Sequence, residues 1–379
     1  MQLPEHIVTL LHLLESNGFQ SFVVGGCVRN VLLGLSPDDW DICTQATPEE
    51  MFSVFREFTV IPTGIKHGTV TVLCQDGQAE ITTFRTDGAY ADSRHPKSVS
   101  FVSTIEEDLA RRDFTVNAMA YHPKRGLVDP YGGQKDLKSK RLRCVGEPDF
   151  RFQEDALRIL RALRFASVYS LDIEEATSSA MHKNKEGLQK IARERIYSEL
   201  TKTLTSKSPG KILSQYPDIL SVIFQTDYSF TDALTALDSL PATVSLRLAA
   251  LLQPLDGAAL NSLKPDNHTK KQVRFLLANT ELSLPATLTE TRQLIREHGL
   301  KQVSLLFAFK GENPRFIHEI LDKNLCCSLK ELALSGKDLL AAGVPEGEKI
   351  AAYLSQALDA VIQGIVPNEK KALLNYLFL

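Results

Sequence analysis

The strongest constraint on the fold is a change of sequence pattern near residue 137. Before that point, short β-branched runs such as FVV, DICT, TVTVL and EITTF alternate with Gly, Asp and Pro. These runs predict the strands of a small mixed sheet, with helices at 4–17, 28–33 and 48–56. Beyond about residue 150 the strand signals stop, and Leu, Ala, Glu and Lys recur at helical spacing. We therefore expect an α+β protein, with a sheet unit followed only by helices.

Composition limits the class of protein. Hydrophobic residues make up 43% of the 379 residues and charged residues 23%, which is typical of globular proteins that stay in water. No apolar run approaches the roughly 20 residues that span a bilayer, and the first residues lack the pattern of a signal peptide. These features predict a cytoplasmic protein with no membrane partner. The six cysteines show no CxxC spacing, which argues against a zinc site or a disulfide framework.

The net charge of −3 argues against a protein coated in positive charge, so any nucleic-acid contact must be local. The segment 138–164 is such a place, because its lysines and arginines outnumber its acids.

The stretch GGCVRNVLLGLSPDDWDICT, residues 25–44, holds the first chemical motif. Asp39 and Asp41, placed in one predicted strand, would point to the same face. Two neighbouring carboxylates repel each other unless a cation lies between them, and Mg²⁺ is held in this way together with substrate phosphates. A solvated turn is the alternative, since DxD is common. The preceding Gly25 and Gly26, with Arg29 on the following helix, favour a phosphate site beside the metal.

A third acid, Glu80, opens the predicted strand EITTF. It can complete a catalytic set with Asp39 and Asp41 from a neighbouring strand. The alternative is an ordinary exposed glutamate on a strand.

The segment RRDFTVNA, residues 111–118, is the next candidate. Arg111 and Arg112 offer forked donors for phosphate. Asp113 can accept a hydrogen bond from a ribose hydroxyl, and Asn117 can add a neutral one. A charge pair at the start of a helix is the alternative.

The segment EDALRILRALRFA predicts an amphipathic helix over 154–166. One face is apolar and the other carries Glu154, Asp155, Arg158, Arg161 and Arg164. A solvated face with i,i+4 ion pairs is the alternative. Asp155 and Arg158, spaced i,i+3, also match a base edge that presents an amine beside an acceptor. Cytosine and adenine have such an edge, whereas uracil and guanine place a carbonyl oxygen against the carboxylate, so C and A should be selected.

Taken in order, these segments resemble the class II CCA-adding tRNA nucleotidyltransferases of the polymerase β superfamily, in their bacterial form. The resemblance is carried by GGCVRN, DWDICT, EITTFRTDGAY, RRDFTVNA, DPYGGQKDL, EDALRILRALRFA and ERIYSEL. It implies a seahorse-like arrangement. Its parts would be a nucleotidyltransferase head at 1–137, a neck at 138–205 that selects the nucleotide, a helical body at 206–310 and a tRNA-binding tail at 311–379.

The resemblance also implies roles for single residues. Asp39 and Asp41 would bind Mg²⁺, and Gly26, Arg29 and Arg112 would hold the incoming nucleotide. Glu154 would orient Arg158, and the neck residues would select the base as a protein template (Asp155, Arg158, Arg161 and Arg164). The family usually has Asp where this chain has Asn30, which puts an ion pair at that position in doubt.

The implied activity is addition of CCA to the 3′ end of tRNA from CTP and ATP, with release of pyrophosphate. The partner would be the acceptor and TΨC arms of tRNA, and the protein would be a monomer or a homodimer. The polar segment 85–103 is not visibly shortened, which favours complete CCA addition over the CC-adding, A-adding or poly(A)-adding members. A DxD glycosyltransferase and a non-catalytic RNA-binding protein on a degenerate head are the more distant alternatives.

Overall fold

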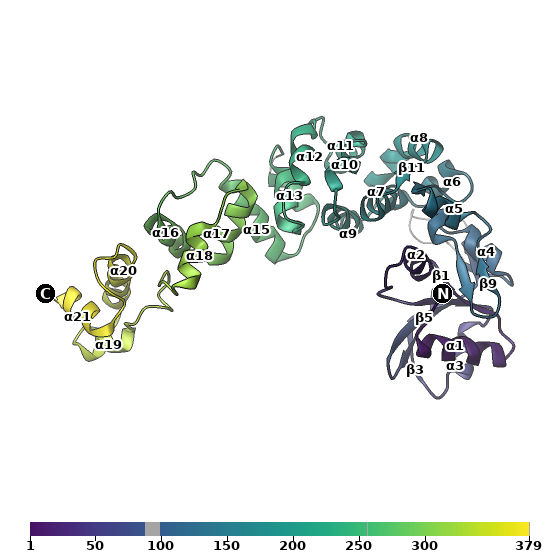
Figure 1. The fold of residues 1–379 in the computed structure, drawn as a ribbon, viewed down its shortest axis with the longest axis horizontal. Helices are drawn as coiled ribbons and strands as arrows, with labels where there is room; N and C mark the ends of the chain where they lie inside the picture. Colours follow the sequence, from purple (N-terminus) through teal and green to yellow (C-terminus); the bar gives the residue numbers. More distant parts are fainter. Residues whose placement is uncertain (88–98, 256, 379) are drawn as a thin grey trace. The chain divides into compact units, whose positions relative to one another are not determined.

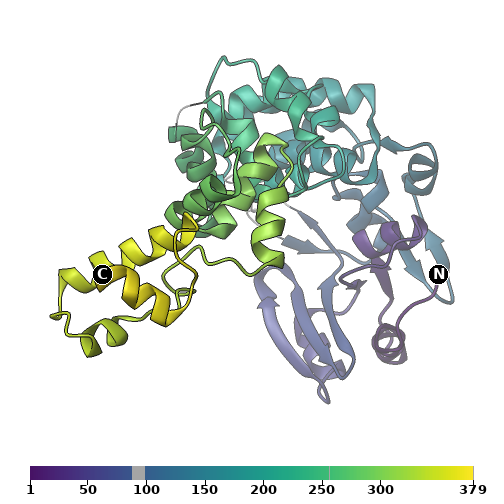
Figure 2. The ribbon, with the colours of Figure 1, turned by 60° about the vertical axis from the view of Figure 1, so that its left-hand side comes forward.

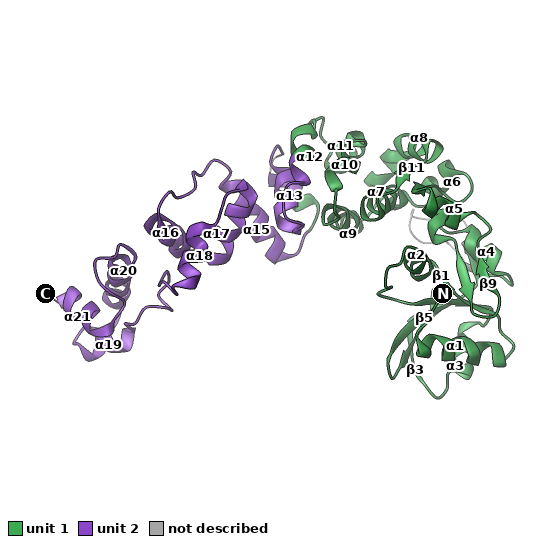
Figure 3. Cartoon of the chain, in the orientation of Figure 1, with its two compact units in different colours: residues 1–235, 261–264 green, residues 236–260, 265–379 purple. Residues whose placement is uncertain are grey.

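The computed structural model describes residues 1–87, 99–255 and 257–378. The chain divides into two compact units (Figure 3): Met1–Thr235 with Asn261–Lys264, and Ala236–Leu260 with Pro265–Leu379. The first unit contains the sheet and the residues expected to form the site. The finer division into head, neck, body and tail stays a prediction.

A mixed sheet forms the base of the first unit, and its strands lie side by side in Figure 2. Its strand order is β3-β4-β5-β2-β1-β8-β9, and the pair β2 and β5 is parallel while the other neighbours are antiparallel. The strands are β1 (Ser21–Val24), β2 (Asp41–Thr44), β3 (Thr59–Gly64), β4 (Thr69–Cys74), β5 (Gly77–Thr83), β8 (Ala120–His122) and β9 (Gly126–Val128). The predicted strands are confirmed, and β8 was not predicted.

In a separate two-stranded sheet, β6 (Arg85–Asp87) pairs with β7 (Val99–Phe101) in antiparallel register. The polar segment 85–103 contains both strands, but its central part, residues 88–98, lies outside the described residues.

Short helices flank the sheet (Figure 1): α1 (Glu5–Ser16), α2 (Gly26–Leu32), α3 (Pro48–Val54), α4 (Ile105–Ala110) and α5 (Gly133–Lys138). The apolar stripe of α1 is buried, as its spacing predicts, and consists of Ile7, Leu10, Leu11 and Leu14. A capping box between Thr47 and Glu50 starts α3. Before α2, Gly25 has a φ of 74° and its backbone runs so close to Arg112 that an added Cβ would lie 2.7 Å from Nη1. Only glycine fits this approach without strain.

Helices then take over: α6 (Pro148–Glu154), α7 (Leu157–Tyr169), α8 (Glu175–Asn184), α9 (Arg193–Leu204), α10 (Pro209–Leu213), α11 (Pro217–Phe224) and α12 (Thr231–Leu237). The expectation of helices alone after residue 137 is wrong in one place. There β10 (Arg141–Leu142) pairs in parallel with β11 (Asp172–Ile173). These strands are only two residues long, which is too short to leave an alternating pattern in the sequence.

The helix predicted over 154–166 is also interrupted. Asp155 has extended backbone angles, φ −145° and ψ 102°, so α6 ends at Glu154 and α7 begins at Leu157. The apolar stripe itself is confirmed: Ala156, Ile159, Leu160 and Leu163 are at most 3% exposed. Periodicity therefore identified the buried face correctly, although it gave no signal for the break.

Within the second unit, the described residues form helices: α13 (Val244–Leu252), α14 (Gly257–Ser262, which ends in the first unit), α15 (Asn267–Ala278), α16 (Leu288–His298), α17 (Leu300–Lys310), α18 (Arg315–Asp322), α19 (Gly336–Ala341), α20 (Glu348–Ile362) and α21 (Lys370–Phe378). Arg292 on α16 is buried and donates to the carbonyl oxygens of Cys326 and Ile362, which fastens α20 to α16. Among the described residues, no helix is long and apolar enough to span a membrane.

Candidate active site

A cavity of about 490 Å³ in the first unit gathers most of the predicted site residues. Arginines dominate its wall, with fewer aspartates, so the cavity suits an anionic ligand. The lining residues are Gly25, Gly26, Arg29, Asp41, Arg111, Arg112, Asp113, Asn117, Asp155, Leu157, Arg158, Arg161, Arg164, Phe165 and Arg195. Asp41 thus shares one cavity with Asp155 and Arg158, although these residues come from distant parts of the sequence.

The three predicted catalytic acids lie around the start of β2. Asp41 is the first residue of the strand and pairs in register with Glu80 on the parallel strand β5. The prediction that Asp39 belongs to the same strand is wrong. Strand β1 pairs with β2 only as far as Ile42 and then turns at Gly25, so the residues before Asp41 have no partner on that side. Asp39 lies in a bend and is exposed.

Burial and neighbouring charges act on the pKa of the Asp41 carboxylate in opposite directions. Burial raises its pKa, the nearby Arg112 lowers it, and the charges of Glu80 and Asp39 raise it again. Asp39 and Glu80 are therefore close enough to act on Asp41, although neither lines the main cavity. Asp39 instead lines a second cavity, which Asp41 also borders.

Arg29 on α2 is buried, with 6% of its surface exposed. Its guanidinium lies 4.3 Å from the ring centre of Tyr169 and donates to the Tyr169 hydroxyl at 2.6 Å. It also donates to the side-chain oxygens of Asn117 and Asn30. These partners are neutral, and burial lowers the Arg29 pKa. The wall of the cavity thus contains a cation whose hydrogen bonds supply no countercharge.

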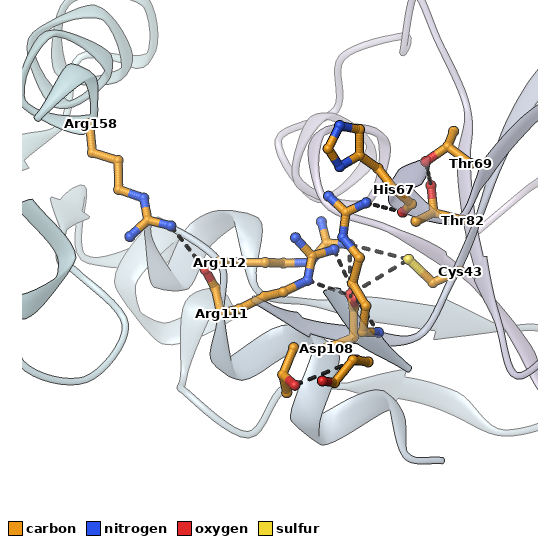
Figure 4. A network of polar contacts seen from close by, with 11 residues as sticks. Cys43, His67, Thr69, Thr82, Asp108, Arg111, Arg112 and Arg158 are labelled. Atoms are coloured by element: carbon orange, nitrogen blue, oxygen red, sulfur yellow. Dashed lines mark hydrogen bonds and ion pairs between the residues drawn. The ribbon is translucent and has the colours of Figure 1, made fainter. Parts of the chain in front are cut away.

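The adjacent arginines Arg111 and Arg112 follow the end of α4 and share one carboxylate, that of Asp108 (Figure 4). Asp108 is fully buried and accepts from Arg111 at 3.0 and 2.8 Å and from Arg112 at 3.1 Å. Burial raises the Asp108 pKa, but the two guanidinium charges outweigh burial and hold that pKa below its usual range. Arg112 also donates to the Cys43 sulfur at 3.3 Å.

Asp113 was predicted to meet a ribose hydroxyl, but the structure places protein donors around it. Its carboxylate accepts from Arg161 at 2.7 and 2.6 Å, from Asn117 at 3.0 Å and from the Phe114 amide at 2.8 Å. Burial alone raises the Asp113 pKa, yet Arg161 and these hydrogen bonds bring it down to about 2. Its direct role here is to fix Arg161.

Asp155 and Arg158, the pair predicted to select the base, lie in the break between α6 and α7 and at the start of α7. Arg158 donates to Glu154 at 2.5 Å, to the Arg151 carbonyl at 3.0 Å and, as Figure 4 shows, to the Arg111 carbonyl at 3.3 Å. Asp155 accepts from the Leu157 amide at 3.0 Å and from Arg195 at 2.8 Å. Both side chains are held by the protein and line the main cavity.

The ring of Phe165 brings together three arginines. Arg164 lies 4.3 Å, Arg29 5.1 Å and Arg161 5.3 Å from its centre. Arg164 also pairs with Glu199 on α9 at 3.1 Å. Like charges are thus gathered around one aromatic ring, whose quadrupole offsets part of their repulsion.

Sequence reasoning missed several residues that shape the site. Asp108 precedes Arg111 by three positions, an i,i+3 acid that could have been noticed. Arg195 and Glu199 lie in the recognised ERIYSEL segment but received no role, because helical spacing does not show which distant side chain they meet. Tyr169 and Phe165 looked like ordinary core residues.

Comparisons with known proteins agree with this arrangement. The poly A polymerase head domain family matches residues 21–143, the probable RNA- and SrmB-binding site of polymerase A matches 170–216, and the putative tRNA nucleotidyltransferase domain 2 matches 248–377.

Relatives extend over nearly the whole chain. A CCA-adding enzyme of Lactobacillus delbrueckii subsp. bulgaricus is 36% identical over 97% of this chain and 96% of its own length. One from Streptococcus mutans is 36% identical over 98% of this chain and 96% of its own length.

Solved structures give the same result. The Bacillus stearothermophilus CCA-adding enzyme in complex with CTP has a TM-score of 0.82 and 30% identity, covering 100% of this chain and 98% of that one. The Thermotoga maritima enzyme complexed with tRNA shares the fold, with a TM-score of 0.72 and 22% identity over 99% and 96% of the two chains. A head with a mixed sheet, an arginine-lined cavity and full-length relatives of one kind lead to a single conclusion: the chain belongs to the family of CCA-adding enzymes, which are tRNA nucleotidyltransferases.

Proposed function

We propose that this chain adds C, C and A in turn to the 3′ end of tRNA, using CTP and ATP and releasing pyrophosphate. The observation that carries the proposal is the main cavity, which Asp41 lines together with Asp155 and Arg158. A metal-binding acid and a base-reading pair in the same cavity are what template-independent nucleotidyl transfer requires.

Base selection is assigned to Asp155 and Arg158. The Asp155 carboxylate can accept from the exocyclic amine of cytosine or adenine, and Arg158 can donate to the neighbouring ring acceptor. Glu154 and the carbonyl oxygens of Arg151 and Arg111 support the Arg158 guanidinium in one orientation. Because the donors are fixed before the nucleotide enters, little ordering is needed on binding.

Nucleotide phosphates are assigned to the cationic wall. Arg29 and Arg112 supply forked donors, and Gly25 and Gly26 keep the backbone free of side chains there. Arg161, Arg164 and the positioning residue Asp113 complete this side of the site. Phosphate charge would then supply the countercharge that the neutral partners of Arg29 lack.

Mg²⁺ fits the acids at the start of β2. Among the described residues, no group of three or more His, Cys, Asp or Glu has metal-binding geometry. Mg²⁺ is nonetheless commonly held by one or two carboxylates together with substrate phosphates, a set that Asp39 and Asp41 can provide. When bound there, Mg²⁺ neutralises phosphate charge and acidifies the attacking hydroxyl. Glu80 would act by making the Asp41 carboxylate more basic, since the charge of Glu80 raises the Asp41 pKa.

The partner is tRNA, with CTP and ATP as the small substrates. The region of residues 170–216 matches a family described as an RNA-binding site of polymerase A, which supports RNA contact next to the cavity. We assign the acceptor and TΨC arms to the helical parts, where shape and phosphate contacts would dominate. A cytoplasmic location and a monomeric or homodimeric state stay predictions from the sequence.

A poly(A) polymerase or a CC- or A-adding enzyme is less well supported. The match to the poly A polymerase head covers only residues 21–143, whereas the relatives matched over nearly the whole chain are CCA-adding enzymes. These full-length relatives also argue against a DxD glycosyltransferase and against a non-catalytic RNA-binding protein.

The test is incubation of the purified protein with tRNA lacking its last three nucleotides. With CTP and ATP together, the product should end in CCA and stop there. Unlimited addition of A, or addition of only CC or only A, would contradict the proposal. Asp41→Asn should lower the rate at least a hundredfold with tRNA affinity unchanged, whereas the exposed Asp76→Asn serves as a matched control.

A further inference from the structure

A second cavity, of about 590 Å³, adjoins the main one. The two share Gly26, Arg29, Asp41, Arg164 and Phe165. The second cavity continues past these residues to the C-terminal halves of α7 and α9 and to the residues before β2. Its further lining residues are Cys27, Asn30, Asp38, Asp39, Val168, Tyr169, Lys202, Thr205 and Ser206. We propose that it receives the departing pyrophosphate and that Lys202 is a further contact for that group, an inference that rests on the proposed function.

The direction of the reaction leads to this assignment. The 3′-oxygen of the RNA forms the new bond to the α-phosphorus, and the bond between that phosphorus and the oxygen bridging to the β-phosphate breaks. The electron pair leaves with pyrophosphate, and the hydroxyl proton passes to solvent. Because the attacking and leaving oxygens are roughly in line, the leaving group moves away from the RNA end.

The residues that line the two cavities indicate where the leaving group would go. The base is assigned to Asp155 and Arg158, which line only the main cavity. Asp41, assigned to the Mg²⁺ that acts at the phosphates, lines both cavities. A nucleotide laid from the base site towards Asp41 therefore carries its outer phosphates to the shared wall of Arg29 and Arg164. The second cavity continues beyond that wall.

The cations of the second cavity, Arg29, Arg164 and Lys202, equal its acids in number and lie on different elements from them. Arg29 is buried with neutral hydrogen-bond partners, so its charge is available to a ligand. Lys202 is exposed, and no ion pair involves it among the described residues. The acids of this cavity all come from the segment 38–41, next to the proposed metal site, whereas the cations come from α2, α7 and α9.

Lys202 differs from the arginines in a way that fits a leaving group. A lysine ammonium on a flexible stem can follow a moving phosphate, whereas the arginines are fixed by Tyr169 and Glu199. Such a cation stabilises charge as it develops and releases the product easily.

The experiment compares Lys202→Met with Lys207→Met, a matched control at an exposed lysine that lines neither cavity. Inhibition of CCA addition by added pyrophosphate, and the KM for CTP and for ATP, are measured with tRNA lacking CCA. We expect Lys202→Met to weaken pyrophosphate inhibition about tenfold and to raise both KM values by a common factor, because the triphosphate is shared. The dissociation constant for tRNA should not change, and Lys202→Arg should restore most of the effect.

Two outcomes overturn the inference while leaving the proposed function intact. One is pyrophosphate inhibition equal to that of Lys207→Met. The other is weaker tRNA binding with unchanged pyrophosphate inhibition, which would show that the second cavity holds the RNA end. A wild-type protein that adds no nucleotide would instead remove the proposed function, and this inference with it.

Discussion

At the scale of single residues, the site depends on which charges are compensated inside the protein. Asp108 pairs with both Arg111 and Arg112 and so offsets one of their two charges, and Asp113 pairs with Arg161; these arginines are held in place before a ligand arrives. Arg29 is different, because its side-chain partners are two asparagines and a tyrosine. Sequence spacing identified these arginines, but only the fold shows which of them retain an uncompensated charge.

Asn30→Asp tests this difference. Asn30 already accepts two hydrogen bonds from Arg29, at 3.2 and 2.9 Å, so Asp can keep the geometry and add a countercharge. We expect the ligand-free protein to gain about 1 kcal/mol of stability, because a hydrogen bond to a charged partner is stronger than one to a neutral partner. Thermal unfolding with and without CTP measures this effect. An unchanged unfolding temperature without CTP would show that Arg29 needs no countercharge.

Asp108→Asn tests the shared carboxylate. Both arginines lose their ionic partner, so we expect the KM for CTP and ATP to rise about tenfold, with a smaller change in kcat. The circular dichroism spectrum should match that of the wild type at the assay temperature, and Asp108→Glu should recover part of the affinity. A fall in kcat alone would point to a different role for this carboxylate.

The raised pKa of Asp41 predicts a pH dependence. Burial is the main cause, and the charges of Glu80 and Asp39 add to it. Protons should therefore compete with Mg²⁺ for Asp41 at a higher pH than for an ordinary carboxylate, so more Mg²⁺ is needed for half-maximal rate as the pH falls. Glu80→Gln removes one like charge and should shift this competition to lower pH. If the pH dependence of the Mg²⁺ requirement is the same in that variant as in the wild type, Glu80 has no effect on the pKa of Asp41.

At the scale of elements, the break between α6 and α7 determines which side chain holds Asp155, a residue proposed to read the base. An uninterrupted helix would have kept Asp155 on the same turn as Arg158, where the two could pair with each other. The extended backbone at Asp155 instead lets Arg195 of α9 hold its carboxylate. Periodicity predicted the buried stripe of α7, since burial repeats along a helix. The break at Asp155 left no signal in that periodicity, and the contact with Arg195 that accompanies it joins residues 40 positions apart.

Arg195→Ala should therefore loosen Asp155 without removing it. We expect the preference for CTP over UTP to fall about tenfold, because a mobile carboxylate distinguishes an amine from a carbonyl poorly. Single-nucleotide addition to tRNA lacking CCA measures the ratio, and Arg195→Lys should keep most of it. If the ratio holds while both rates fall together, Arg195 acts on catalysis rather than on selection.

At the scale of the whole molecule, the sequence predicted the sheet unit, the helical remainder and most of the cavity wall. Motifs such as GGCVRN and RRDFTVNA show what a site contains, because each chemical task needs particular side chains at short spacing. The sequence predicted that Glu80 lies on a strand next to that of Asp41, but not their parallel register, the role of Asp108 or the second cavity with Lys202. These depend on strand register and helix packing, which bring together residues far apart along the chain.

The most direct test of the central claim is the nucleotide preference of Asp155→Asn. An asparagine can turn its amide N–H towards the carbonyl oxygen of uracil, whereas the aspartate can only accept. The rates of first addition to tRNA lacking CCA are measured with CTP and with UTP for the wild type and the variant. The account predicts that the ratio of UTP to CTP addition rises at least tenfold in the variant. An unchanged ratio would contradict base selection by the Asp155 and Arg158 surface.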